Sequence, residues 1–121
     1  MTKILIIEDD PLLLRMYKRV FTHNGFEVES ASDGEEGFGK AKKSKFSLII
    51  TDVMMPKMNG LELLEKLKKN LKTSHIPLVI LTTLKNQKEI EAAYSKGAAQ
   101  FIIKSEHDPK KVLEIVKNLL A

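Results

Sequence analysis

The sequence contains no cysteine, so neither a disulfide framework nor a thiolate metal site is possible. It also lacks any apolar run near the ~18 residues that suggest a membrane-spanning helix. The amino terminus enters a short strand-like run without the pattern of a signal peptide. No repeat, linker or low-complexity tail interrupts the chain. These absences lead us to expect a cytoplasmic protein that does not insert into a membrane.

Apolar residues make up 43% of the 121 positions, enough to bury a core. This length is near the commonest size of one domain, so we expect a single domain over residues 1–121 that folds alone. The net charge of +4 could indicate a nucleic-acid partner. Because the lysines are spread over several predicted helices, we favour solvated helix faces and expect no direct nucleic-acid binding.

Short apolar runs rich in isoleucine and valine alternate with longer stretches of helical period. This alternation predicts βαβ units and a doubly wound parallel sheet that helices cover on both faces. The predicted strands are residues 3–7, 26–31, 46–51, 78–81 and 100–103. The predicted helices begin at residue 11, run over 34–43, follow the loop 52–59, run over about 86–96, and begin again at 109.

Local signals define how these helices start and pack. Asp10 is the expected N-cap of the first helix, with Pro11 at its first position. Four leucines mark the inner face of the third helix: Leu63, Leu64, Leu67 and Leu71. The fourth helix has only Ile90, Ala93 and Tyr94 facing inward, so we expect thin packing there.

Polar residues follow four of the five predicted strands. They are Glu8, Asp9 and Asp10 after the first, Asp52 after the third, Thr82 and Thr83 after the fourth, and Lys104 after the fifth. A doubly wound sheet binds ligands outside the carboxyl ends of its strands. We therefore expect these side chains to converge.

Converging carboxylates repel one another, and a hard divalent cation removes that repulsion. Mg²⁺ prefers carboxylate, carbonyl and water ligands and leaves positions open for phosphate oxygens. Lys104 would add a fixed positive charge for a phosphoryl group, and Thr82 a hydroxyl. Each residue alone has a simpler interpretation: the first acids as helix caps, Asp52 as a turn former, Lys104 as a counter-charge and Thr82 as structural. The combination indicates a phosphoryl site.

Four stretches together resemble the receiver domains of response regulators, and in particular single-domain regulators like those of chemotaxis. They are residues 4–11 (ILIIEDDP), 49–60 (IITDVMMPKMNG), 80–83 (ILTT) and 101–104 (FIIK). Their order and spacing match the family along the whole chain. The resemblance implies a flavodoxin-like α/β fold with strand order 2-1-3-4-5 and five helices. It also implies a cytoplasmic phosphorylation switch of a two-component system that catalyses only its own phosphorylation and dephosphorylation.

Carried over residue by residue, the resemblance implies that Asp52 is the phosphoacceptor. The phosphoryl group would come from a phosphohistidine on a sensor histidine kinase or a histidine phosphotransfer protein. Asp9, Asp52 and the backbone carbonyl of Met54 would hold Mg²⁺, and Glu8 would act through a metal-bound water.

The resemblance also implies a switch. Lys104 would pair with the acyl phosphate, Thr82 would move to bond it, and Phe101 occupies the aromatic position that turns inward as the threonine moves. An acyl phosphate brings about two negative charges and several acceptor oxygens, which can bias a two-state surface. We expect a protein target on the last strand and the helices on either side of it, and a monomeric chain.

The sequence departs from the family pattern at three places, the third of which is a pair of residues. Glu8 stands where aspartate is commonest, which lengthens the arm and leaves a direct ligand role open. Ser105 follows Lys104 where proline usually forms a cis peptide, and a cis bond without proline costs ~2.5 to 4 kcal/mol. The sequence leaves open whether this bond is cis or trans, and with it the direction of Lys104. Met54 and Leu84, both apolar, border the expected path of hydrolytic water, which predicts slow dephosphorylation.

Two other functions compete with this interpretation. A phosphatase of the haloacid-dehalogenase type would need a second acid two residues after the nucleophile, and Met54 stands there. A receiver-like adaptor that binds partners without phosphorylation is the other alternative, which the set of acids, threonine and lysine disfavours. Met1 just before the first strand and the end just after the last helix suit a stand-alone regulator, although an excised domain would look the same.

Overall fold

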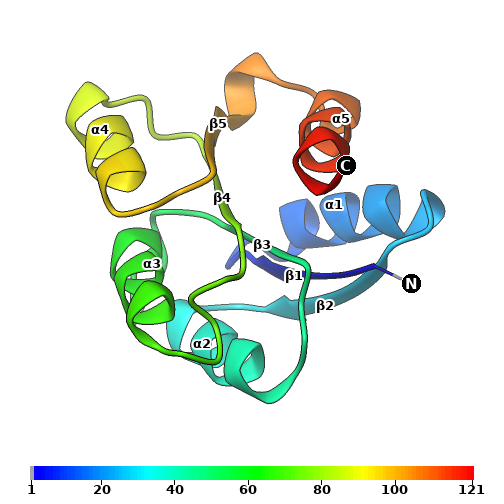
Figure 1. Cartoon of the computed structure of the whole chain (residues 1–121). Helices are drawn as coiled ribbons and strands as arrows, with labels where there is room; N and C mark the ends of the chain where they lie inside the picture. Colours follow the sequence, from blue (N-terminus) through cyan, green and yellow to red (C-terminus); the bar gives the residue numbers. More distant parts are fainter. Residues whose placement is uncertain (1) are drawn as a thin grey trace.

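The computed structural model describes residues 2–121, in which strands and helices alternate along the chain (Figure 1). The strands are β1 (Lys3–Ile7), β2 (Glu27–Ala31), β3 (Leu48–Thr51), β4 (Leu78–Thr82) and β5 (Gln100–Ile103). The α-helices are α1 (Pro11–His23), α2 (Gly34–Lys43), α3 (Gly60–Lys69), α4 (Gln87–Ser95) and α5 (Pro109–Leu120), with a short 3₁₀ helix, η1 (Lys104–Glu106), after β5. Within residues 2–121, no helix has both the length and the apolar character needed to cross a membrane.

All strands pair in parallel in the order β2-β1-β3-β4-β5, which confirms the predicted doubly wound fold. The register aligns the carboxyl ends of neighbouring strands. Ile7 of β1 lies opposite Thr51 of β3, so Glu8 and Asp52 leave adjacent strands at the same level. Thr82 of β4 lies opposite Ile103 of β5, which brings Lys104 to the same edge.

Two apolar layers cover the sheet. Side chains alternate along each strand, so Leu5 and Ile7 of β1 point to one layer while Ile4 and Ile6 point to the other. The first layer includes residues of α2, α3 and α4, and the second includes residues of α1 and α5. Figure 1 shows these two groups of helices on opposite sides of the sheet. Burial on both faces explains the continuous apolar runs of the strands.

The first helix begins as predicted. The Asp10 side chain accepts hydrogen bonds from the backbone N–H groups of Leu12 and Leu13, at 2.9 and 3.4 Å, and Pro11 occupies the first turn. These bonds satisfy donors that the helix leaves unpaired.

The predicted inner face of α3 is wrong at Leu71, whose surface is 93% exposed. The helix ends at Lys69, before this residue. The hydroxyl of Thr73 donates to the carbonyl of Leu67 at 2.7 Å, and the chain turns away after Asn70. A side-chain hydrogen bond at the end of α3 therefore accompanies a helix end two residues before Leu71.

The thin packing predicted for α4 is present, since Ala93 is its buried residue. Tyr94, expected to face inward, is 45% exposed. Its hydroxyl nevertheless accepts a hydrogen bond of 3.0 Å from the backbone N–H of Phe101 in β5. The ring therefore lies across the edge of the sheet instead of filling the core.

Candidate functional site

The ammonium group of Lys104 lies between two carboxylates at the carboxyl edge of the sheet. Its Nζ donates to Oε1 of Glu8 at 2.5 Å and to Oδ2 of Asp52 at 2.9 Å. All three side chains are buried, with exposed fractions of 8% for Lys104, 6% for Glu8 and 10% for Asp52. The structure thus brings together residues from the ends of three different strands.

The direction of Lys104, which the sequence left open, is set by a trans backbone. Residues 2–121 contain no cis peptide bond, so the bond between Lys104 and Ser105 is trans. The chain turns into η1 at this point, and the lysine side chain reaches past the end of β4 to Asp52. A trans bond before Ser105 is therefore compatible with a lysine at the acid cluster.

The backbone that follows Asp52 fixes its carboxylate. Oδ1 accepts hydrogen bonds from the N–H groups of Val53, at 2.6 Å, and Met54, at 3.2 Å. The loop then folds back, and the N–H of Gly60 donates to the carbonyl of Val53 at 2.9 Å. A Cβ at position 60 would overlap the carbonyl oxygen of Asp52. Glycine is therefore required where α3 begins.

Burial and pairing act against each other on the charges of this cluster. Burial raises the pKa of Glu8, and the hydrogen bond and charge of Lys104 only partly offset it. Burial alone would lower the pKa of Lys104, but the hydrogen bonds to Glu8 and Asp52 outweigh it and the pKa is raised. Lys104 therefore stays a cation at neutral pH, while burial disfavours ionisation of the Glu8 carboxyl group.

Thr82 and Phe101, the predicted switch residues, are both buried. Thr82 is fully buried, and its Oγ1 accepts a hydrogen bond of 3.3 Å from the N–H of Leu84. Among residues 2–121, no hydrogen bond joins Thr82 to Asp52 or Lys104. Phe101 is 9% exposed and packs in the core layer under α2, α3 and α4. The aromatic ring is thus turned inward in this structure.

The remaining predicted residues lie around the cluster formed by Glu8, Asp52 and Lys104. Asp9 is exposed, and Asp10 is exposed and caps α1. Met54 is 58% exposed, whereas Leu84 is half-buried against the core. These residues and the buried acids come from the same sheet edge, but they differ in access to solvent.

The acids offer the right donor type for Mg²⁺, which binds carboxylate and carbonyl oxygens. However, no three acidic or histidine side chains among residues 2–121 surround a common centre. Glu8 and Asp52 each direct one oxygen to Lys104 instead. The oxygens of Asp52, Asp9 and the Met54 carbonyl therefore fit the ion by chemistry, and Lys104 competes with it for the two buried carboxylates.

One feature of the site could not be read from the strand ends. Lys104 forms an ion pair with Glu8 as well as with Asp52, so the two carboxylates share one cation. The signal in the sequence is the glutamate at position 8, whose extra methylene group lengthens the arm that reaches Lys104. The carboxylate of Glu8 is also held by the N–H of Asp10, at 3.2 Å from Oε2.

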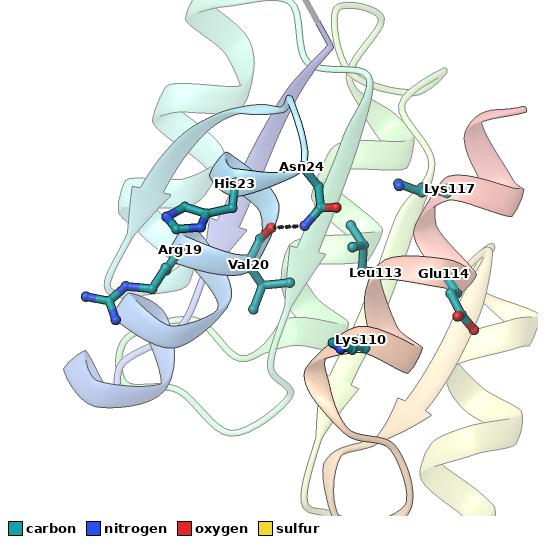
Figure 2. A pocket seen from close by; sticks show the side chains of 8 residues that line it. All are labelled: Arg19, Val20, His23, Asn24, Lys110, Leu113, Glu114 and Lys117. Atoms are coloured by element: carbon teal, nitrogen blue, oxygen red, sulfur yellow. Dashed lines mark hydrogen bonds between the residues drawn. The ribbon is translucent and has the colours of Figure 1, made fainter.

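A separate hollow of about 400 Å³ lies between α1 and α5, away from these acids. Figure 2 shows Val20 and Leu113 between the two helices, with Arg19 on one side and Lys110 and Lys117 on the other. None of the residues predicted for the phosphoryl site lines it. The chemistry at the sheet edge therefore does not depend on this hollow.

Comparison with known proteins gives a consistent picture. The family model described as "Response regulator receiver domain" matches residues 4–117. The chain is 38% identical, over 119 residues, to the probable transcriptional regulator ycf29 of Pyropia yezoensis. That alignment covers 98% of this chain and 53% of the relative, so the chain spans about half the length of that protein.

Solved structures with the same fold are also similar in sequence. A CheY-like response regulator receiver domain protein from Methanospirillum hungatei JF-1 superposes with a TM-score of 0.92 at 31% identity, covering 99% of this chain and 94% of that chain. A chain from the CheX-CheY-BeF3-Mg+2 complex of Borrelia burgdorferi gives a TM-score of 0.91 at 27% identity, covering 99% and 90%.

Proposed function

The chain belongs to the response regulator receiver domain family, and we propose that it is a phosphorylation switch of a two-component system with Asp52 as its phosphoacceptor. The observation that carries the proposal is the buried Asp52 carboxylate with the Lys104 ammonium 2.9 Å from its Oδ2. A fixed cation at this place stabilises the charge that develops when a carboxylate accepts a phosphoryl group. Receiver domains are typically phosphoacceptors rather than enzymes with a separate substrate.

The phosphoryl donor would be a phosphohistidine on a sensor histidine kinase or a histidine phosphotransfer protein. A carboxylate oxygen of Asp52 attacks phosphorus, the P–O bond forms as the P–N bond breaks, and the imidazole nitrogen leaves with the electron pair. Val53, Met54 and Lys104 hold the two carboxylate oxygens in place, so the nucleophile is oriented before the donor arrives.

The product carries about two negative charges on its phosphoryl group in place of the single charge of the Asp52 carboxylate, so the negative charge beside Glu8 rises. Lys104 would then turn its hydrogen bonds to the phosphoryl oxygens, and Glu8 would need a new partner. We assign Mg²⁺ binding to Asp9, Asp52 and the Met54 carbonyl, with Glu8 acting through a water. When bound, Mg²⁺ would neutralise charge on the phosphoryl oxygens. The Mg²⁺ named with CheY in the similar Borrelia complex supports this assignment.

Thr82 would couple phosphorylation of Asp52 to a change at the protein surface. Its hydroxyl would exchange the bond to Leu84 N–H for one to a phosphoryl oxygen, and Leu84 lies in the connection to α4. Because α4 buries little more than Ala93, a small change in this connection can move it. Tyr94 and Phe101 link α4 to β5 through the bond between them, and Phe101 would serve as the aromatic switch. We therefore place the binding surface for a downstream protein on α4, β5 and α5, in a monomeric cytoplasmic regulator.

The proposal is tested by intact-mass measurement after incubation with acetyl phosphate, with and without Mg²⁺. The wild type should gain one phosphoryl group in the presence of Mg²⁺, and Asp52→Asn should gain none. Asp10→Asn is the matched control, because it removes a carboxylate at the same sheet edge and keeps an N-cap residue. It should be phosphorylated like the wild type. A phosphoryl adduct on Asp52→Asn would place the acceptor elsewhere.

A further inference from the structure

A second hollow lies at the opposite end of the strands from Asp52. It has a volume of about 510 Å³ and is lined by Lys42, Lys43, Ser44, Lys45, Lys72 and His75. These residues come from the end of α2 and the connection after it, and from the connection between α3 and β4. The hollow is therefore formed by the segments that precede β3 and β4, whereas the acid cluster is formed by segments that follow the strands.

The hollow gathers positive charge without any acid in its lining. Its four lysines make no ion pair among residues 2–121, although Lys40 of the same helix pairs with Glu36 at 3.6 Å. Lysines in the last turn of α2 interact favourably with the negative end of the helix dipole, which explains the presence of Lys42 and Lys43. Lys45, Lys72 and His75 lie beyond the helix ends, where the dipole gives no such reason.

The backbone that carries Lys72 and His75 is held in a defined shape. The fully buried hydroxyl of Thr73 donates to the carbonyl of Leu67 at 2.7 Å. The side-chain oxygen of Asn70 accepts from the N–H of Lys72 at 2.9 Å, and Lys68 Nζ donates to the carbonyls of Ser74 and Ile76 at 3.3 and 3.4 Å. The backbone of this connection is thus held by α3 and by its own hydrogen bonds, while the side chains of Lys72 and His75 are exposed.

The lining selects a class of ligand. Lysine ammonium groups bind phosphate as point charges, and the hollow has no arginine fork for a carboxylate. It also has no carboxylate to bind a divalent cation and no apolar or aromatic residue in its lining on which a base could stack. Phe38, which is outside the lining, has Lys42 Nζ over its face, 4.3 Å from the ring centroid.

We infer that this hollow, which we call the lysine pocket, binds a chain of linked phosphate groups, because its lining contains four lysines that make no ion pair among residues 2–121 and contains no acid. The ligand is a short oligophosphate, either inorganic or carried by a nucleotide. It is recognised through its phosphates alone. Its binding is separate from phosphorylation of Asp52, which lies at the other end of β3.

The test is a titration of ¹⁵N-labelled full-length protein with inorganic tripolyphosphate, without Mg²⁺ and at about 150 mM salt so that weak surface attraction is screened. Amide signals of residues 42–45 and 70–75 should shift, and those beside Asp52 should not. A variant with Lys43→Ala, Lys45→Ala and Lys72→Ala should bind at least about tenfold more weakly, equal to about 1.4 kcal/mol. Its melting temperature and its labelling by acetyl phosphate should match those of the wild type.

The matched control removes the same charge elsewhere, through Lys18→Ala, Lys88→Ala and Lys111→Ala, three exposed lysines on other helices. It should change the affinity for tripolyphosphate less than about twofold. Equal weakening in the two triple variants, or amide shifts outside the lysine pocket, would overturn the inference, because only net charge would then matter.

Titrations with three further ligands distinguish the possible sources of the phosphate groups. ATP that binds about as tightly as tripolyphosphate, without shifts in its adenine protons, would support recognition of phosphates on a nucleotide; absence of ATP binding would assign the pocket to inorganic chains. Orthophosphate that binds equally well would overturn the requirement for linked phosphates. A single-stranded oligonucleotide that binds where tripolyphosphate does not would overturn the inference in favour of a nucleic-acid surface.

Discussion

At the scale of single residues, Glu8 carries a buried charge that Lys104 only partly compensates. Its pKa is raised above 4.5 because burial outweighs the hydrogen bond and charge of Lys104. A carboxyl group with a raised pKa binds its proton more tightly in the folded chain than in the unfolded chain. Its contribution to stability is therefore complete below about pH 4.5 and is lost as the pH rises through the folded pKa.

Replacement Glu8→Gln should consequently raise the free energy of unfolding near pH 7, since the amide oxygen still accepts from Lys104 but carries no charge. The difference from the wild type should shrink toward zero below about pH 4.5, where Glu8 itself is neutral. Urea unfolding at several pH values between these limits measures both effects. A variant less stable than the wild type near pH 7 would show that the charge of Glu8 is net stabilising.

The lifetime of the phosphorylated form should depend on Met54 and Leu84. Met54 donates its backbone N–H to Asp52 and Leu84 donates its own to Thr82, so both side chains start beside the acceptor and the switch residue. Neither side chain can orient an attacking water. The double variant Met54→Asn with Leu84→Glu should speed phosphate release by about tenfold or more, which is about 1.4 kcal/mol of barrier. Equal release rates from the purified phosphoproteins would mean that these residues only cover the site.

The sequence could place Glu8, Asp52 and Lys104 at one edge because each directly follows a buried strand. It could not show that Lys104 contacts both carboxylates, since that depends on the path of a long side chain past β4. The roles of Asp9, Met54 and Thr82 stay predictions, because the structure shows the first two around the buried cluster and Thr82 bonded to its own loop.

At the scale of helices and strands, the apolar periodicity and the signals at element ends were sufficient to predict most element boundaries. The predicted α2 and β5 agree with the structure at both ends, because a polar cap or a turn bounds each of them. Periodicity was wrong for Leu71, where a buried threonine ends the helix, and for Tyr94, whose hydroxyl bonds to an edge strand. Both errors arise from side-chain hydrogen bonds between positions that an apolar pattern does not relate.

Two glycines in helices provide a matched prediction. Gly60→Ala should lower the free energy of unfolding by roughly 1 to 3 kcal/mol and reduce labelling of Asp52, because the added methyl group overlaps the Asp52 carbonyl. Gly39→Ala, in α2, meets nothing within 4 Å and should raise stability by roughly 0.5 to 1 kcal/mol. Denaturant unfolding and acetyl phosphate labelling distinguish the two. Equal effects of the variants would show that contact with the acceptor loop is unimportant.

At the scale of the whole molecule, the proposed metal site couples ion binding to folding. Mg²⁺ should raise the melting temperature of the wild type, because the folded acid cluster binds it and the unfolded chain binds it far less. At an Mg²⁺ concentration 100 times the dissociation constant, this stabilisation is about 2.7 kcal/mol. Asp9→Ala should lose most of the gain, whereas Asp10→Ala should keep it. An equal response of the wild type and Asp9→Ala in thermal melts would refute the assignment of Asp9.

The position of Lys104 has a consequence for cooperativity. This lysine belongs to the segment that follows the outermost strand on its side of the sheet, while its two partners follow β1 and β3. Detachment of β5 and α5 alone would leave two buried carboxylates without their cation, a loss of about 3 to 5 kcal/mol when one partner of a buried ion pair is removed. The carboxylates of Glu8 and Asp52, which follow the central strands, therefore oppose local unfolding of β5 and α5. The amide protons of this carboxyl-terminal segment should exchange with solvent mainly when the whole domain unfolds.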